Sequence, residues 1–115
     1  MILGNATRVF VYQAPVDMRR QIDGLSLLAQ GISAEVLSGA AFVFFNRPRD
    51  KVKILWWDGS GLCLFSKRLD DRGFPWPLDN GADSTVTLSP AQLSMLLEGI
   101  DWRAPERRWQ PAVAG

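Results

Sequence analysis

The feature that most constrains this chain is a pair of strand-like segments joined by four turn-forming residues. Lys51–Trp57 begins with alternating polar and apolar residues, and Leu62–Leu69 follows after the linker Asp58–Gly61, which reads Asp-Gly-Ser-Gly. Glycine supplies the positive φ that tight hairpin turns require. The sequence therefore predicts an antiparallel β-hairpin, around which the rest of the fold is arranged.

The turn also predicts which residues pair. If Gly59 and Ser60 occupy the two loop positions, Trp57 lies opposite Leu62, whereas a bulge or a longer loop would shift this register. Cross-strand partners share one face of a sheet. One face then carries Val52, Ile54, Trp56, Cys63, Phe65 and Lys67, and the other carries Lys51, Lys53, Leu55, Trp57, Leu62, Leu64, Ser66 and Arg68.

Two further strands and a helix are predicted before the hairpin. Thr7–Tyr12 is β-branched and aromatic, and Ala40–Phe45 is apolar throughout. Between them, Asp17 can cap a helix with one apolar stripe, formed at steps of three and four by Met18, Ile22, Leu25, Leu28 and Ile32. The sequence does not fix the strand order, and Thr7–Tyr12 is a candidate edge strand that could pair two copies of the chain.

A second helix is predicted to begin at Ser89. Pro90 suits its first position, and Gln92 completes a capping box with Ser89. Its apolar stripe consists of Leu93, Leu96, Leu97 and Ile100. The segment 72–83 before it is rich in Gly, Pro, Asp and Asn, which favours a loop.

These elements predict an α+β fold, a small antiparallel β-meander with an additional N-terminal strand, packed against two helices. The 115 residues suffice for one domain. We assign residues 1–102 to it and interpret residues 103–115, which contain two prolines and no periodicity, as a flexible tail.

Composition excludes several kinds of catalytic and metal site. The chain has no histidine and one cysteine, which removes histidine triads, the usual zinc ligands and intrachain disulfides. It contains no nucleophile elbow, phosphate-binding loop or dinucleotide fingerprint. We therefore expect no enzyme activity, no catalytic residue, no metal and no cofactor. A metal-dependent nuclease stays as a minor alternative that rests on scattered acidic residues alone.

The sequence also favours a cytoplasmic protein. No apolar run approaches the ~20 residues of a membrane span, and the first 12 residues lack the pattern of a signal peptide.

Positive charge gathers around the open end of the predicted hairpin, although the net charge of the whole chain is only +1. Such clustering is typical of nucleic-acid binders, and an aromatic side chain can add stacking on bases. The alternative is that cations at strand ends keep a sheet edge soluble. The candidate nucleic-acid-binding residues are Arg47, Arg49, Lys51, Lys53, Trp57, Lys67 and Arg68.

Tryptophan and arginine also recur toward the C-terminus, and both residue types are enriched at protein interfaces. The candidate partner-binding residues are Trp76, Trp102, Arg107, Arg108 and Trp109. The alternative is a disordered terminus with no binding role.

Several strings in this chain resemble one family. They are Asp17–Arg20 (DMRR), Ile22–Leu25 (IDGL), Phe42–Phe44 with Asn46–Arg47, Lys53–Gly61 (KILWWDGSG), Lys67–Leu69, Gly73–Pro77 (GFPWP) and Leu96–Trp102 (LLEGIDW). In this order, from about Val9 to Trp102, they resemble the TnpB-type accessory proteins of the insertion-sequence group numbered sixty-six, encoded by its second open reading frame. Gln21 and Ser66 depart from the family pattern, which commonly has a small residue and an aromatic residue there.

The resemblance implies a bacterial mobile-element protein that assists a larger transposase without performing the chemistry itself. The expected partners are that transposase and DNA of the element, with no membrane contact. The alternative is a protein–protein adaptor that does not contact nucleic acid. The oligomeric state stays open, with a dimer through an edge strand as one arrangement.

Overall fold

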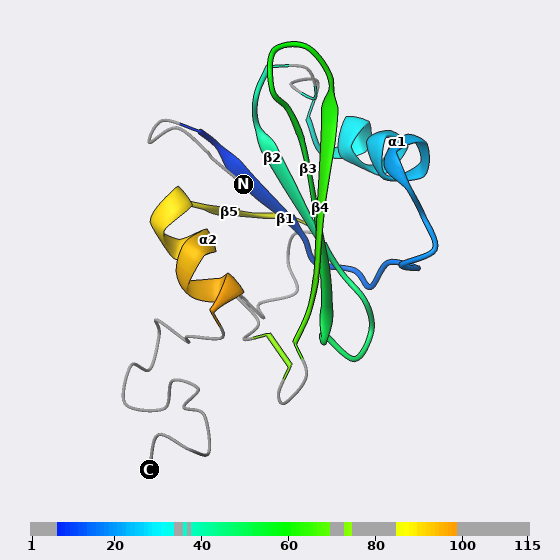
Figure 1. The fold of residues 1–115 in the computed structure, drawn as a ribbon, viewed down its shortest axis with the longest axis vertical. Helices are drawn as coiled ribbons and strands as arrows, with labels where there is room; N and C mark the ends of the chain where they lie inside the picture. Colours follow the sequence, from blue (N-terminus) through cyan, green and yellow to red (C-terminus); the bar gives the residue numbers. More distant parts are fainter. Residues whose placement is uncertain (1–6, 34–35, 37, 70–72, 75–84, 99–115) are drawn as a thin grey trace.

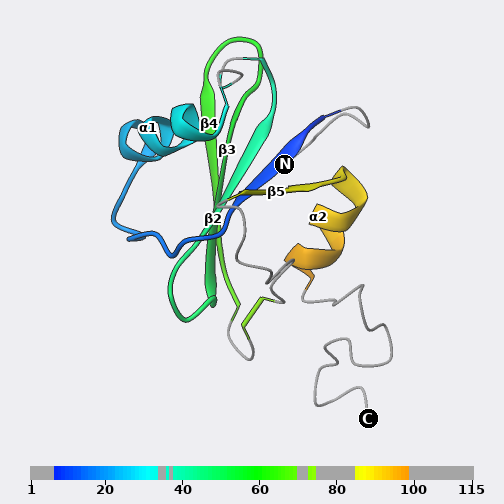
Figure 2. The same ribbon diagram turned by 180° about the vertical axis from the view of Figure 1, so that it is seen from behind.

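A computed structural model of the chain describes residues 7–33, 36, 38–69, 73–74 and 85–98. The described elements are, in chain order, β1 (Val9–Tyr12), α1 (Ile22–Ile32), β2 (Ala41–Phe45), β3 (Lys51–Trp57), β4 (Leu62–Arg68), β5 (Thr85–Leu88) and α2 (Pro90–Leu97). The strands form one sheet in the order β4-β3-β2-β1-β5, with the two helices on opposite faces (Figure 1, and from behind in Figure 2). The predicted α+β class is confirmed.

The β3–β4 hairpin has the predicted register, with Trp57 opposite Leu62. Gly59 has a φ of 105°, which suits the first central position of a hairpin turn. The Asp58 carboxylate accepts a hydrogen bond from the Ser60 N–H at 2.9 Å and so closes the turn locally. The two predicted faces are therefore the two faces of the sheet.

β1 and β5 complete the sheet in a way that the sequence did not reveal. β1 runs parallel to β2, with Val9 opposite Ala41, and antiparallel to β5, with Val11 opposite Val86. A parallel pair needs a crossover connection, and α1 lies within it. The expectation that Thr7–Tyr12 forms an edge is wrong, because β5, a short strand that we did not predict, covers β1. Among the described strands the edges are β4 and β5.

α1 begins later than predicted. The Asp17 carboxylate accepts a hydrogen bond from the Arg19 main-chain N–H at 2.9 Å, a local bond that competes with helix formation. The residue before the helix is Gln21, which makes no side-chain cap bond. The predicted stripe nevertheless packs on the sheet, where Leu25 is fully buried. Met18, Ile22, Leu28 and Ile32 pack against the same cluster.

α2 begins as the sequence predicts. The Ser89 Oγ accepts from the Gln92 N–H at 3.1 Å, and the Gln92 Oε1 accepts from the Ser89 N–H at 2.9 Å. Leu93 and Leu96 are buried on the opposite face of the sheet from α1, and Leu97 packs beside them. The predicted stripe residue Ile100, the predicted tail and most of the predicted 72–83 loop lie outside the described residues.

Replacing Ser89 with alanine is expected to lower the free energy of unfolding by about 1 kcal/mol, because the N–H of Gln92 loses its acceptor. Urea denaturation checks this value. Ser89→Asp keeps an acceptor at the cap and serves as the control. Equal losses in the two variants would contradict a capping role.

β2 lies at the centre of the core, because both faces of the sheet are covered over it. Phe42 and Phe44 belong to the cluster on the α1 face, and Val43 and Phe45 to the cluster on the α2 face. The described residue Phe74 joins the second cluster, with its ring 5.7 Å from that of Phe45 between centroids. Phe74, which follows β4 in the chain, therefore belongs to the core.

Candidate nucleic-acid interface

The described part of the chain is more basic than the whole. It holds nine Lys and Arg residues against five Asp and Glu, whereas the full sequence has 13 and 12. Seven of the nine lie within residues 19–20, 47–53 and 68. The near-neutral net charge therefore conceals a local positive excess.

The loop between β2 and β3 presents two of the predicted cations on a braced frame. The Asn46 amide donates to the Asp50 carboxylate at 2.6 Å and accepts from the Lys51 N–H at 3.0 Å. Arg49 has a φ of 62°, in the left-handed region, and its main-chain N–H donates to the Asn46 carbonyl at 3.1 Å. Arg47 and Arg49 are both exposed. The loop geometry therefore holds these two arginines on the surface.

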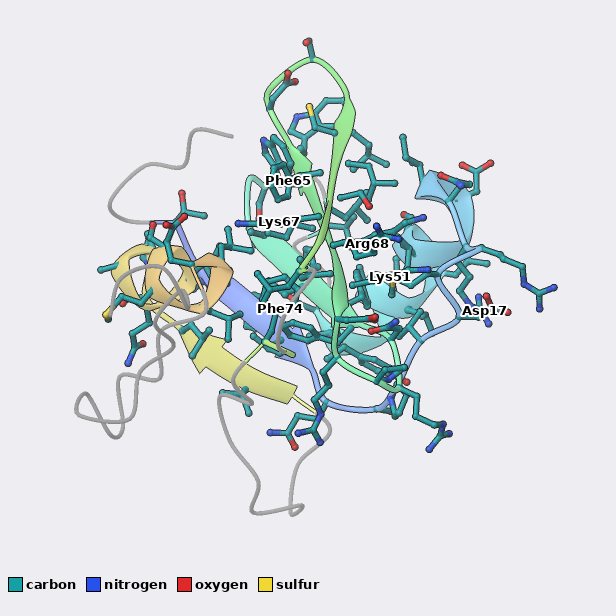
Figure 3. All side chains as sticks on the ribbon, turned by 60° about the horizontal axis from the view of Figure 1, so that its bottom comes forward. Asp17, Lys51, Phe65, Lys67, Arg68 and Phe74 are labelled. Carbon is teal, nitrogen blue, oxygen red and sulfur yellow. The ribbon has the colours of Figure 1, made fainter. Side chains whose placement is uncertain are left out.

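Lys51 and Arg68 lie directly opposite each other at the open end of the hairpin. Both are exposed, and Figure 3 shows both on the side of the hairpin that faces α1. Like charges directly opposite across an antiparallel pair are destabilising. Two exposed cations therefore stand side by side at this end of the hairpin.

Two of the predicted cations form hydrogen bonds within the protein. Lys53 is 7% exposed, and its Nζ donates to the carbonyl oxygens of Met18 and Arg20 at 2.8 and 2.9 Å. Lys67 points to the other face, where its Nζ donates to the Leu97 carbonyl at the end of α2 at 2.8 Å (Figure 3). Both ammonium groups therefore bond to main-chain carbonyls within the protein, and the structure does not bring them together with the exposed cations.

The bonds from Lys53 place the main chain of one further arginine, Arg20, beside β3. They hold the turn before α1 against β3, and Arg20 in that turn is exposed. Its neighbour Arg19 pairs with Asp17 at 2.6 Å. The side-chain and main-chain hydrogen bonds from Arg19 lower the pKa of Asp17 to about 2. Asp17 therefore stays ionised near neutral pH and offsets the charge of Arg19.

The basic cluster, as defined here, consists of Arg20, Arg47, Arg49, Lys51 and Arg68. The only sequence signal for Arg20 was its place in the DMRR string. Trp57 does not join the cluster, because Lys51 and Trp57 are the two ends of β3, about 20 Å apart at the rise of a strand. The cations and Trp57 therefore do not form one site that could contact phosphates and stack on bases together.

Cys63, near the tip of the hairpin, lacks the features of a reactive thiol. Partial burial, together with the hydrogen bond and charge of Asp58, raises the pKa of Cys63. The thiol is therefore protonated near neutral pH, whereas nucleophilic cysteines have a lowered pKa.

The remaining predicted sites lie largely outside the described residues. This applies to the whole partner-binding set of Trp76, Trp102, Arg107, Arg108 and Trp109. Within the part of the chain that the structure describes, no three His, Cys, Asp or Glu side chains come together as metal ligands would. None of the helices described has the length and apolar character needed to cross a membrane.

Comparisons with known proteins agree with the resemblance of the sequence strings. The chain is 42% identical over 113 residues to the uncharacterized protein y4hO of Sinorhizobium fredii, covering 97% of this chain and 96% of that one. It is 34% identical over 102 residues to the uncharacterized protein y4jC of the same organism, covering 88% and 86%. No solved structure matches the chain significantly. The family model described as "IS66 Orf2 like protein" matches residues 7–107, and the chain therefore belongs to this transposition-associated family.

Proposed function

We propose that this protein is a non-catalytic accessory factor of transposition that binds DNA of the element through the basic cluster. The observation that carries the proposal is that three separate segments bearing exposed cations lie next to one another at one end of the sheet. The segments are the turn before α1, the β2–β3 loop and the open end of the hairpin. Lys and Arg side chains arranged in this way neutralise backbone phosphates and release counterions.

The cluster favours contacts to phosphates over contacts to base edges. Its cations lie on a turn, a loop and strand ends, and Trp57 is at the opposite end of β3. Phosphate contacts position a protein on DNA, whereas base contacts specify sequence. We therefore expect modest sequence preference from this surface alone. In the proposed role, the transposase of the same element is the partner that supplies chemistry and end recognition.

Fluorescence anisotropy of a labelled duplex from the end of the element, titrated at several salt concentrations, tests the proposal. The combined variant Arg47→Gln, Lys51→Gln and Arg68→Gln removes three cations that the fold does not bury. We expect its affinity near physiological salt to fall on the order of 100-fold. The slope of log K against log salt should become shallower by about 3.

Arg8→Gln is the control, because Arg8 is exposed and lies away from the β2–β3 loop. Its carbonyl accepts from the Ala41 N–H, at the other end of β2. The affinity of this variant should stay close to that of the wild type. If the triple variant and the control lost the same amount of DNA affinity, the basic cluster would not be the DNA-binding surface. Absence of binding by the wild type at low salt would contradict DNA contact and favour the alternative, a protein–protein adaptor for the transposase.

A further inference from the structure

Along most of β4, one edge of the described sheet lacks the features with which proteins block strand pairing, and its two cations, Lys67 and Arg68, stand at its end. β4 has seven residues, and no described strand pairs with its outer side. Its ladder with β3 contains no bulge, and the strand contains no proline. Its first four residues, Leu62–Phe65, are apolar and only half-buried. The other edge, β5, has only four residues. A long, unbulged, apolar edge is a template for another strand.

The hairpin ladder fixes which main-chain groups this edge offers. The Asp58 N–H donates to the Gly61 carbonyl at 3.0 Å, and the Leu69 N–H donates to the Asp50 carbonyl at 2.8 Å. Hydrogen-bonded and non-hydrogen-bonded pairs alternate in an antiparallel ladder. The N–H and C=O groups of Leu64 therefore point outward from the sheet, as do those of Leu62 and Ser66. An extended strand can pair with such a row of alternating donors and acceptors along its whole length.

We propose that a second copy of this chain pairs with β4 in antiparallel orientation and extends the sheet across a two-fold axis. The strand is self-complementary about Phe65, which places Leu64 opposite the partner's Ser66. The same register places the cations Lys67 and Arg68 opposite the partner's apolar residues Cys63 and Leu62. A parallel arrangement would instead place like charges side by side, which is unfavourable.

This pairing also has a consequence for DNA binding, and that consequence alone rests on the proposed function. Opposite residues in a sheet share a face, so the α1 sides of both copies lie on the same side of the extended sheet. Each copy then brings one basic cluster to this surface. The clusters lie at opposite ends of the paired β4 strands, separated along them by about 20 Å.

Sedimentation equilibrium of the full chain without DNA tests the pairing independently of DNA binding. We expect a dimer at micromolar concentrations, and a monomer for Ser66→Pro. Ser66 is exposed and its N–H faces away from β3, so proline removes an outward donor and leaves the hairpin ladder intact. Ser66→Thr is the control and should remain dimeric. Far-ultraviolet circular dichroism checks that both variants are folded. A monomeric wild type, or a folded dimeric Ser66→Pro, would overturn the proposal.

A disulfide experiment tests the register. Lys67→Cys places a thiol opposite the partner's Cys63 in a non-hydrogen-bonded pair, where the Cα atoms are about 4.5 Å apart, within the range of disulfides. Mild oxidation should convert this variant to a covalent dimer on a non-reducing gel. Ser66→Cys presents its thiol on the other face of the sheet and should stay uncrosslinked. A folded Lys67→Cys chain that does not crosslink would overturn the register about Phe65.

Discussion

Replacing Phe74 with alanine is expected to lower the free energy of unfolding by about 4 kcal/mol, because truncation of a buried aromatic ring leaves a cavity. Phe74 is 3% exposed and lies in the cluster on the α2 face beside Phe45. Its main-chain N–H donates to the Arg49 carbonyl at 2.7 Å. The neighbouring Gly73 packs closely against the β2–β3 loop. A Cβ at this position would lie only 3.2 Å from the Arg49 carbonyl oxygen, so a larger residue would push the loop away. Phe74 therefore anchors both the core and the loop that presents two cations.

Urea denaturation of Phe74→Ala, with Phe74→Leu as the volume-retaining control, measures this contribution. The leucine variant should lose much less stability, because hydrophobic replacements of similar size are tolerated better. Under conditions in which the alanine variant remains folded, we also expect weaker binding to duplex DNA, although no charge has changed. A loss below about 1 kcal/mol, the range of ordinary substitutions, would show that Phe74 does not anchor the core.

Replacing Lys53 with methionine is expected to lower the free energy of unfolding by about 3 kcal/mol. The change removes two charge-assisted hydrogen bonds and leaves the carbonyls of Met18 and Arg20 without their donor. These bonds hold the turn before α1 against β3, so the variant should also loosen this turn. Thermal or urea unfolding of the variant measures the loss.

Lys51→Met is a closely matched control for this experiment. Lys51 lies two residues earlier on the same face of β3, but it is exposed. Its replacement should change the stability by no more than about 0.5 kcal/mol, as is usual for surface positions. It should instead weaken DNA binding. Equal destabilisation by the two substitutions would contradict the structural role of Lys53.

The elements that the sequence predicted correctly are those stabilised by neighbours along the chain. The β3–β4 register follows from Asp58 and Gly59, whose turn closes within four residues. The start of α2 follows from the reciprocal bonds of Ser89 and Gln92. The predicted start of α1 was wrong for a related reason. The Asp17 carboxylate accepts a hydrogen bond from the main-chain N–H two residues later, in a turn, instead of capping the helix.

The position of β1 and the roles of the lysines required the tertiary structure. β1 pairs with β2 and β5, which lie far along the chain, and β5 has only four residues in which to show its alternation. Lys53 and Lys67 read in sequence like their exposed neighbours, yet their acceptors lie 30 or more residues away. Local hydrogen bonds and hydrophobic alternation involve residues close together in the chain, so they can be predicted from the sequence. Which lysine is buried, which strand is left at an edge and which cation-bearing segments become neighbours depend on packing between distant segments, and only the folded chain decides them.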